Sequence, residues 1–154
     1  MHDPFFILGI ETSTPAGGVA VVDCNGRCMA QDWWQDNRPV STRLMKSIDS
    51  IMQFGLKGSM VPAAVSTTHG PGTFTGTRVG LGIAKDLALN WKIPLYTCSS
   101  LRALAGRLEH PDCLVCPVLD ARRGEVYHGL YEIQGHAPPQ PVRPDEVTSI
   151  HTLL

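Results

Sequence analysis

Short apolar runs alternate with turn-forming residues along the first third of the chain. FFILGIE (5–11) has the pattern of a strand that ends in a carboxylate, and VAVVD (19–23) follows it after a turn-rich loop. Asn25-Gly26 is a strong hairpin signal, so CMAQDWW (28–34) should form a third antiparallel strand. Because adjacent strand residues point to opposite faces, we expect one of Trp33 and Trp34 in the core and the other outside.

The pattern then changes to helical spacing. Ser41 should cap a helix with an apolar stripe, and Gly55 should end it; the stripe is Leu44, Ile48, Ile51 and Met52, widened by Met45. AAVST (63–67) predicts a buried strand, the glycine loop THGPGTFTGTR (68–78) follows, and a second helix spans 75–90. IPLYT (93–97) predicts the next strand, and Ser99 or Ser100 should cap a helix through Leu108.

The resulting order, βββαβαβα, is that of the actin-like ATPase and ribonuclease H-like folds, with a mixed sheet covered by helices. Residues 113–135 then repeat the opening pattern of strand, acid, loop, glycine and strand, with Asp120 in the place of Glu11. We therefore predict an α/β protein with a first actin-like lobe over residues 1–110. Residues 111–154 should form the start of a second, related lobe that is incomplete in this chain.

Charge and cysteine content narrow the function. The formal net charge is -1, and no basic stripe is present, so any contact with RNA should be indirect. The first residues have no basic head and too short an apolar run for a signal peptide or a membrane span, so we expect a cytoplasmic protein. Five cysteines suit a reducing compartment, and we expect buried or half-buried thiols instead of a zinc site formed by Cys24, Cys28, Cys113 and Cys116.

The glycine loop resembles a phosphate cradle without its lysine, because the first lysine after Gly70 is Lys85. Gly72 and Gly76 should permit backbone conformations that a side chain would obstruct. Glu11 and Asp120 end strands, where actin-like folds hold magnesium and phosphate. In the alternative that we favour, each carboxylate caps its loop by accepting backbone N–H groups. Arg78 opposes the dipole of its helix and should have a specific partner.

Small residues recur at every fourth position of the second helix and form a ridge, which consists of Gly76, Gly80, Ala84 and Ala88. Ile83 and Leu87 lie in the adjacent row. Such a ridge allows another helix or a sheet to approach closely. It either packs against the chain's own sheet or, together with the first helix, binds a partner, and the sequence leaves both interpretations open.

Three motifs carry a resemblance to one family. GPGTFTGTRVGLGIAKDLAL (70–89) is similar to the GPGSFTGxRxGxxxAxGLA signature of the TsaB (YeaZ) family, and DARRGEVY (120–127) resembles its DARxGEVY motif. ILGIETST (7–14) resembles its opening ILxIDTS, with Glu11 in place of the usual aspartate. The similarity runs from about residue 6 to about residue 133, and family members usually continue for a further stretch.

The resemblance implies a non-catalytic subunit with neither catalytic nor metal-binding residues of its own. TsaB proteins bind TsaD, which transfers threonylcarbamoyl to the adenosine beside the anticodon of tRNAs that read ANN codons, and the ATPase TsaE completes the assembly. The expected partners are therefore a TsaD-like subunit and a TsaE-like ATPase, with a homodimer in isolation, indirect contact with tRNA and no membrane contact.

The resemblance also suggests two sets of site residues. The partner interface would consist of Leu44, Met45, Ile48, Met52, Gly76, Gly80, Ile83, Ala84 and Leu87. A vestigial nucleotide or phosphate site would consist of Glu11, Thr12, Gly70, Gly72 and Asp120. No cofactor is expected, except that ATP with magnesium could bind at an interface with a partner.

Two alternatives come from the same superfamily. An ATPase or kinase would use Glu11 and Asp120 for metal-assisted phosphoryl transfer. A divergent M22-type metallopeptidase would need an H-x-x-x-H pair, whereas no two of the six histidines are closer than eight residues. Measurable turnover by the isolated chain would favour either alternative over the non-catalytic interpretation.

Overall fold

The computed structural model describes residues 5–35, 39–55, 61–108, 112–135 and 137–153. The chain forms two compact units. The first unit comprises Met1–His69 and Phe74–Thr97, and the second comprises Gly70–Thr73 and Cys98–Leu154. No helix in the described part of the chain is long and apolar enough to cross a membrane.

The first unit is built on a five-stranded sheet with the order β3-β2-β1-β4-β5. Its strands are β1 (Phe6–Glu11), β2 (Ala16–Asp23), β3 (Cys28–Gln35), β4 (Ala64–Thr68) and β5 (Leu95–Cys98). β1 pairs antiparallel with β2 and parallel with β4, so the sheet is mixed as predicted. The predicted hairpin is also confirmed, because β2 pairs antiparallel with β3. Gly26, in the turn that connects them, has a φ of 80°.

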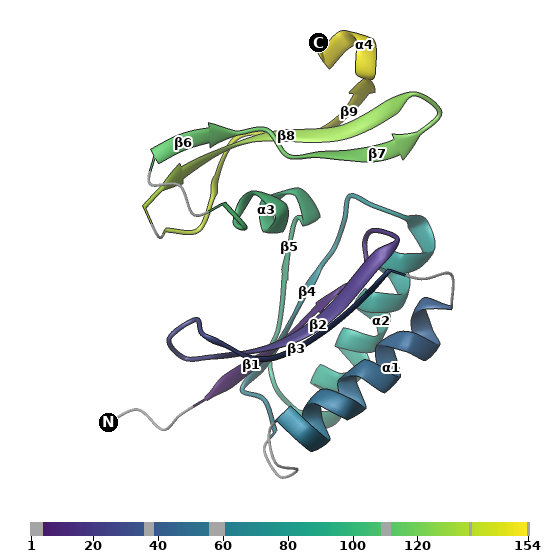
Figure 1. Cartoon of the computed structure of the whole chain (residues 1–154), viewed down its shortest axis with the longest axis vertical. Coiled ribbons are helices and arrows are strands. Elements are labelled where there is room, and N and C mark those ends of the chain that lie inside the picture. The colour runs from purple at the N-terminus through teal and green to yellow at the C-terminus, as the bar shows by residue number, and fades with distance from the viewer. Residues whose placement is uncertain (1–4, 36–38, 56–60, 109–111, 136, 154) are drawn as a thin grey trace. The chain divides into compact units, whose positions relative to one another are not determined.

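Two helices, α1 (Val40–Ser50) and α2 (Phe74–Trp91), lie on one face of this sheet (Figure 1). The predicted start of the first helix is wrong. Pro39 is its N-cap, with an extended ψ of 126°, so Ser41 lies inside the helix and caps nothing. At the other end the chain continues from α1 into a π-helical turn, Ile51–Gly55, so Gly55 is the last described residue of the helical segment.

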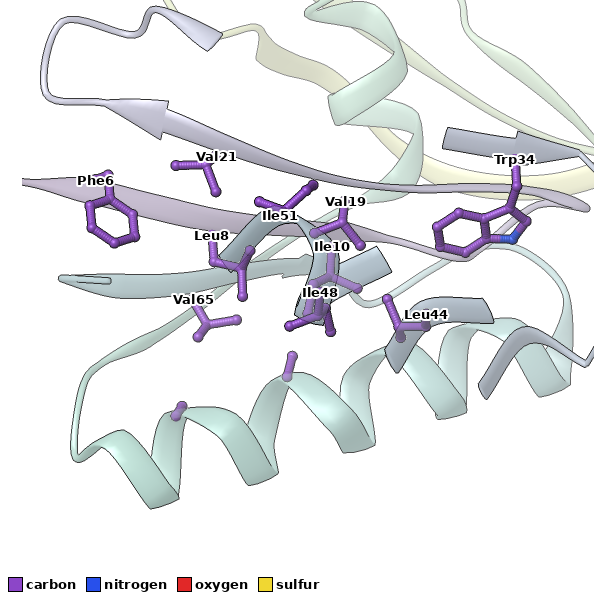
Figure 2. Packing of buried hydrophobic residues seen from close by; sticks show 12 residues of the cluster. Phe6, Leu8, Ile10, Val19, Val21, Trp34, Leu44, Ile48, Ile51 and Val65 are labelled. Carbon is purple, nitrogen blue, oxygen red and sulfur yellow. The ribbon is translucent and has the colours of Figure 1, made fainter. Parts of the chain in front are cut away.

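Alternate residues of the strands point toward the two helices and form the core of the first unit (Figure 2). Leu8, Val21 and Val65 are fully buried there, and Leu44 packs against them from α1. The buried residues that α2 contributes to this cluster are small, Ala84 and Ala88. Trp34 is 5% exposed and Trp33 is 69% exposed, which confirms that one tryptophan is in the core and the other outside.

The second unit is a four-stranded sheet around one long central strand, β8. Its strands are β6 (Asp112–Val115), β7 (Val118–Arg122), β8 (Glu125–Gln134) and β9 (Gln140–Ser149), with helices α3 (Ser100–Ala105) and α4 (Ile150–Leu153). β6, β7 and β9 all pair antiparallel with β8. Ser99 caps α3 as one of the two predicted candidates, although that helix ends before Gly106 instead of at Leu108.

Two features of the second sheet differ from the prediction. CLVCPVLD was expected to be one strand, but it forms β6 and β7 with Cys116 and Pro117 between them. β9 was not predicted, because Pro141 and Pro144 make its sequence resemble a loop; proline is compatible with an edge strand.

The boundary between the units also differs from the predicted division after residue 110. Leu101 and Ala105 of α3 pack against Tyr131 of β8, so α3 belongs to the second unit, which resumes at Cys98. The assignment of the two units to two related lobes stays a prediction.

Tyr131 links the stability of the second unit to alkaline pH. Burial raises the pKa of Tyr131 above its usual value of 10.0, and a hydrogen bond to Asp145 raises it further. A raised folded-state pKa gives stability that is fully present below pH 10 and lost as the pH rises through the folded value. We expect Tyr131→Phe to flatten this alkaline loss in thermal unfolding above about pH 10. Tyr96→Phe, at an exposed position, should leave the loss unchanged; an identical slope in all three proteins would contradict the assignment.

Candidate functional site

Glu11 and Asp120 both act as loop caps. Glu11 Oε1 accepts a hydrogen bond from the backbone N–H of Ser13 at 2.5 Å, and Asp120 Oδ1 accepts one from Arg122 at 2.7 Å. Asp120 also pairs with the Arg122 guanidinium at 3.4 Å, in an exposed position. Glu11 belongs to the first unit and Asp120 belongs to the second. In each loop the carboxylate serves the residue two positions later, which is the role that we favoured from the sequence.

This role predicts the effect of removing the Glu11 carboxylate. Glu11→Ala should destabilise the chain by about 1 kcal/mol, because a half-buried backbone N–H loses its acceptor. Glu11→Gln keeps an acceptor and should recover most of that loss in urea unfolding. Equal destabilisation by both variants would mean that the negative charge, instead of the hydrogen bond, is what the loop requires.

The remaining residues of the predicted nucleotide site have structural contacts. The buried Thr12 hydroxyl donates to the backbone oxygen of Gly76 at 2.8 Å. Gly70 has a φ of 102°, where only glycine is comfortable, and its carbonyl accepts from the N–H of Ser100. Gly72 and Gly76 were predicted to adopt backbone conformations that need glycine, but neither has a positive φ. In this loop Gly70 is the residue whose φ requires glycine. Nucleotide binding by this set stays a prediction.

The small-residue ridge of α2 faces the chain's own sheet. Gly76, Gly80, Ala84 and Ala88 are all buried within the first unit. A Cβ added at Gly80 would lie 2.1 Å from Thr12 Oγ1 of the loop after β1, so the contact leaves no room for a side chain. Of the two interpretations that the sequence left open, internal packing is correct for the ridge.

The other predicted interface residues divide by exposure. Leu44 and Ile48 of α1 are buried in the same core, whereas Met52, Ile83 and Leu87 are partly buried against it. Met45 is 42% exposed. The predicted set therefore mixes core residues with surface residues. Its buried members cannot form a docking surface unless the first unit opens.

A different apolar surface lies on the side of α2 away from the ridge. Phe74 is 69% exposed and Leu89 is 66% exposed, at the two ends of the helix. Between them, a Cβ added at Gly82 would meet nothing within 4 Å. We call Met45, Phe74, Arg78, Gly82 and Leu89 the outer helical surface. Phe74 and Leu89 therefore expose apolar side chains at opposite ends of α2.

Arg78 has an aromatic partner. Its guanidinium carbon lies 3.7 Å from the centroid of the Phe74 ring, one helical turn earlier. The expectation of a specific partner is met, but the partner is a ring instead of a carboxylate or an anion. Phe74 was not among the predicted site residues, although its spacing of four residues from Arg78 is the signal that identifies such pairs on a helix.

A polar contact fixes α1 on β3. Ser47, which is 1% exposed, donates its hydroxyl to Asp32 Oδ2 at 2.6 Å, and Arg43 Nη2 lies 3.6 Å from Asp32 Oδ1. The Arg43 guanidinium also lies 5.8 Å from the Trp34 ring centroid. Because α1 has no side-chain cap, these tertiary contacts and its buried apolar residues hold Met45 in place.

The cysteines differ in part from the expectation. Cys24, Cys28 and Cys116 are exposed, whereas Cys98 and Cys113 are half-buried. Cys24 lies in the turn after β2, and Cys116 lies between β6 and β7, so neither belongs to a strand. Among the residues that the structure describes, no three His, Cys, Asp or Glu side chains form a group that could hold a metal ion.

Comparison with known proteins identifies the family. A family model described as "TsaD: tRNA N6-adenosine threonylcarbamoyltransferase" matches residues 37–151. The tRNA threonylcarbamoyladenosine biosynthesis protein TsaB of Bacillus subtilis is 35% identical over 126 residues, which are 82% of this chain and 55% of that protein. The chain belongs to the TsaB (YeaZ) family. TsaB of Haemophilus influenzae is also 35% identical, over 79% of this chain and 51% of that protein.

A solved structure of the TsaB (YeaZ) family confirms the predicted fold. YeaZ from Pseudomonas aeruginosa superposes on this chain with a TM-score of 0.81 at 28% identity. The match covers 93% of this chain and 67% of the YeaZ chain. The family and the element order together confirm the actin-like, ribonuclease H-like fold class. The chain spans about half the length of the curated TsaB relatives that it matches.

Proposed function

We propose that this chain is a non-catalytic subunit in the formation of tRNA threonylcarbamoyladenosine, and that it binds a TsaD-like threonylcarbamoyl transferase. The observation that carries the proposal is the outer helical surface, which displays Phe74 and Leu89 on a helix whose other side is fully used by the core. The process is that of the TsaB relatives, which are tRNA threonylcarbamoyladenosine biosynthesis proteins.

The outer helical surface suits a helical partner. Gly82 leaves open space beside the helix, so the backbone of another helix can approach closely there. Arg78 is held over the Phe74 ring, which reduces the rotamer entropy that both side chains would lose on binding. Arginine and aromatic side chains are the residue types that most often dominate binding energy. We therefore place Phe74 and Arg78 at the centre of the interface.

The same surface would join two copies of the chain when no TsaD-like subunit is present. A TsaE-like ATPase would complete the assembly, and tRNA would contact the chain only indirectly, in the cytoplasm. The glycine loop contains no lysine, and Glu11 and Asp120 are engaged as caps, which supports a role without catalysis. We assign no cofactor to the chain; ATP with magnesium would bind only where a partner completes a site.

Reconstitution tests the proposal. We expect a TsaD-like and a TsaE-like subunit from the same source to modify tRNA with threonylcarbamoyl only when this chain is added. The chain alone should neither hydrolyse ATP nor cleave peptides. Full modification without the chain, or ATP turnover by the chain alone that Glu11→Gln abolishes, would contradict the proposal.

A further inference from the structure

β9 is the least buried strand of the second unit. None of its ten residues is buried, and most are exposed. Pro141 and Pro144 cannot donate backbone hydrogen bonds, and the register with β8 shifts on both sides of Leu130. Segments with few buried apolar contacts open locally at a lower free energy than the core. The attachment of β9 to β8 therefore rests on backbone pairing and not on buried apolar side chains.

One side chain of β9 adds contacts beyond the backbone pairing with β8. The Asp145 carboxylate accepts hydrogen bonds from the hydroxyl groups of Ser99 and Tyr131, one with each oxygen. To reach them it crosses the face of β8 above Gly129. A Cβ at Gly129 would lie 2.6 Å from Asp145 Oδ1, so the glycine provides the space for this crossing. The contact is thus built from three separate segments.

The two donors are themselves fixed. Ser99 Oγ accepts from the backbone N–H groups of Leu101 and Arg102 at 3.1 and 3.3 Å, which makes it the cap of α3. Tyr131 is 3% exposed within β8, and its hydroxyl lies 3.3 Å from Ser99 Oγ. At the start of the strand, Arg102 Nε donates to the carbonyl of Pro139 at 2.7 Å. The side-chain ties of β9 therefore end on α3 and β8.

We propose that β9 is a releasable strap and that Asp145 is its latch. When the two hydrogen bonds of Asp145 break, β9 detaches from β8 while α3, β6 and β7 keep their structure. Their contacts do not depend on β9: Leu101 and Ala105 pack against Tyr131, and β6 and β7 pair with β8 directly. Release leaves the edge of β8 from Glu125 to Glu132 unpaired and open to another strand.

Hydrogen exchange of the whole chain, followed by mass spectrometry, tests the latch. In the wild type, the exchange rate of the amides in 140–149 should depend less on denaturant concentration than the exchange rate of the amides in β6 and β7. In Asp145→Ala, exchange of 140–149 should rise by about tenfold or more, because two hydrogen bonds to a carboxylate are lost. Protection of β6 and β7 should stay the same.

Matched variants separate the latch from a general loss of stability. Glu146→Ala changes the exposed neighbour on the same strand and should leave exchange unchanged. Ser99→Ala and Tyr131→Phe each remove one donor and should give smaller increases than Asp145→Ala. If 140–149 exchanges together with β6 and β7 in the wild type, or if Asp145→Ala unfolds the second unit as a whole, β9 is no separate strap and the proposal is wrong.

Discussion

Gly80→Leu will strongly destabilise the first unit. A Cβ at this position would already lie 2.1 Å from Thr12 Oγ1, and leucine adds three more carbon atoms. The side chain would force α2 away from β1 and break the buried hydrogen bond from Thr12 to the carbonyl of Gly76. Overpacking typically costs about 1–3 kcal/mol and a broken hydrogen bond about 1 kcal/mol, so the sum is a large share of a domain's usual stability of about 5–15 kcal/mol. Urea unfolding by circular dichroism measures the loss.

The same substitution two residues later is the matched control. Gly82 has open space where its Cβ would be, so Gly82→Leu should keep the fold. It should also raise stability by up to about 1 kcal/mol, because leucine favours a helix more than glycine does. If Gly80→Leu is as stable as Gly82→Leu, the ridge does not pack tightly on β1 and our account of α2 is wrong.

Phe74→Asp will abolish binding to a TsaD-like subunit while the chain stays folded. The ring is 69% exposed and makes little contribution to the core, so its removal should change stability by less than about 0.5 kcal/mol. A central interface residue contributes about 2 kcal/mol or more, equivalent to roughly thirtyfold in Kd, and burying an unpaired carboxylate there adds to the loss. Isothermal titration calorimetry with the TsaD-like subunit measures the change.

Trp33→Asp provides the comparison for this variant. Trp33 is also an aromatic residue with 69% exposure in the same unit, but it lies on β3, not on the helices. Trp33→Asp should leave binding unchanged. Gly82→Leu should weaken binding, because its leucine side chain fills the space where a helix would approach. Equal losses with Trp33→Asp and Phe74→Asp would show that the interface is not specific to the outer helical surface.

Much of the first unit follows from local patterns in the sequence. The alternation in 5–11 and 19–23, the Asn25-Gly26 turn and the helical spacing of 75–90 each predict an element that the structure contains. These signals are strong because the same residues determine local conformation and burial. Ser41 shows the limit of such signals, since the preceding Pro39 is the residue that caps α1.

Which surface a helix leaves free could not be predicted from the sequence. α2 is apolar around most of its circumference, so spacing identified the small-residue ridge but not the partner that covers it. Only the contact between Gly80 and Thr12, 68 positions apart in the chain, shows that the ridge is internal. Phe74 was overlooked for the related reason that an exposed aromatic residue and a buried one look alike in a sequence.

In the second unit, long-range contacts outweigh local signals. β9 contains two prolines and no buried residue, so no apolar alternation marks it as a strand. It is placed by pairing with β8 and by the hydrogen bonds of Asp145 to Ser99 and Tyr131, 46 and 14 positions away. The loop carboxylates are the opposite case, because a cap two residues away is a local feature that the sequence already favoured for Glu11 and Asp120.

The most direct test of the central claim is sedimentation velocity of this chain mixed with the TsaD-like subunit of its own source. Our account predicts one heavier species in the mixture, which is absent with Phe74→Asp and retained with Trp33→Asp. Two independent boundaries for the wild-type mixture, at concentrations where both chains are folded, would contradict the account. A complex that forms equally well with Phe74→Asp would contradict the assignment of the outer helical surface as its interface.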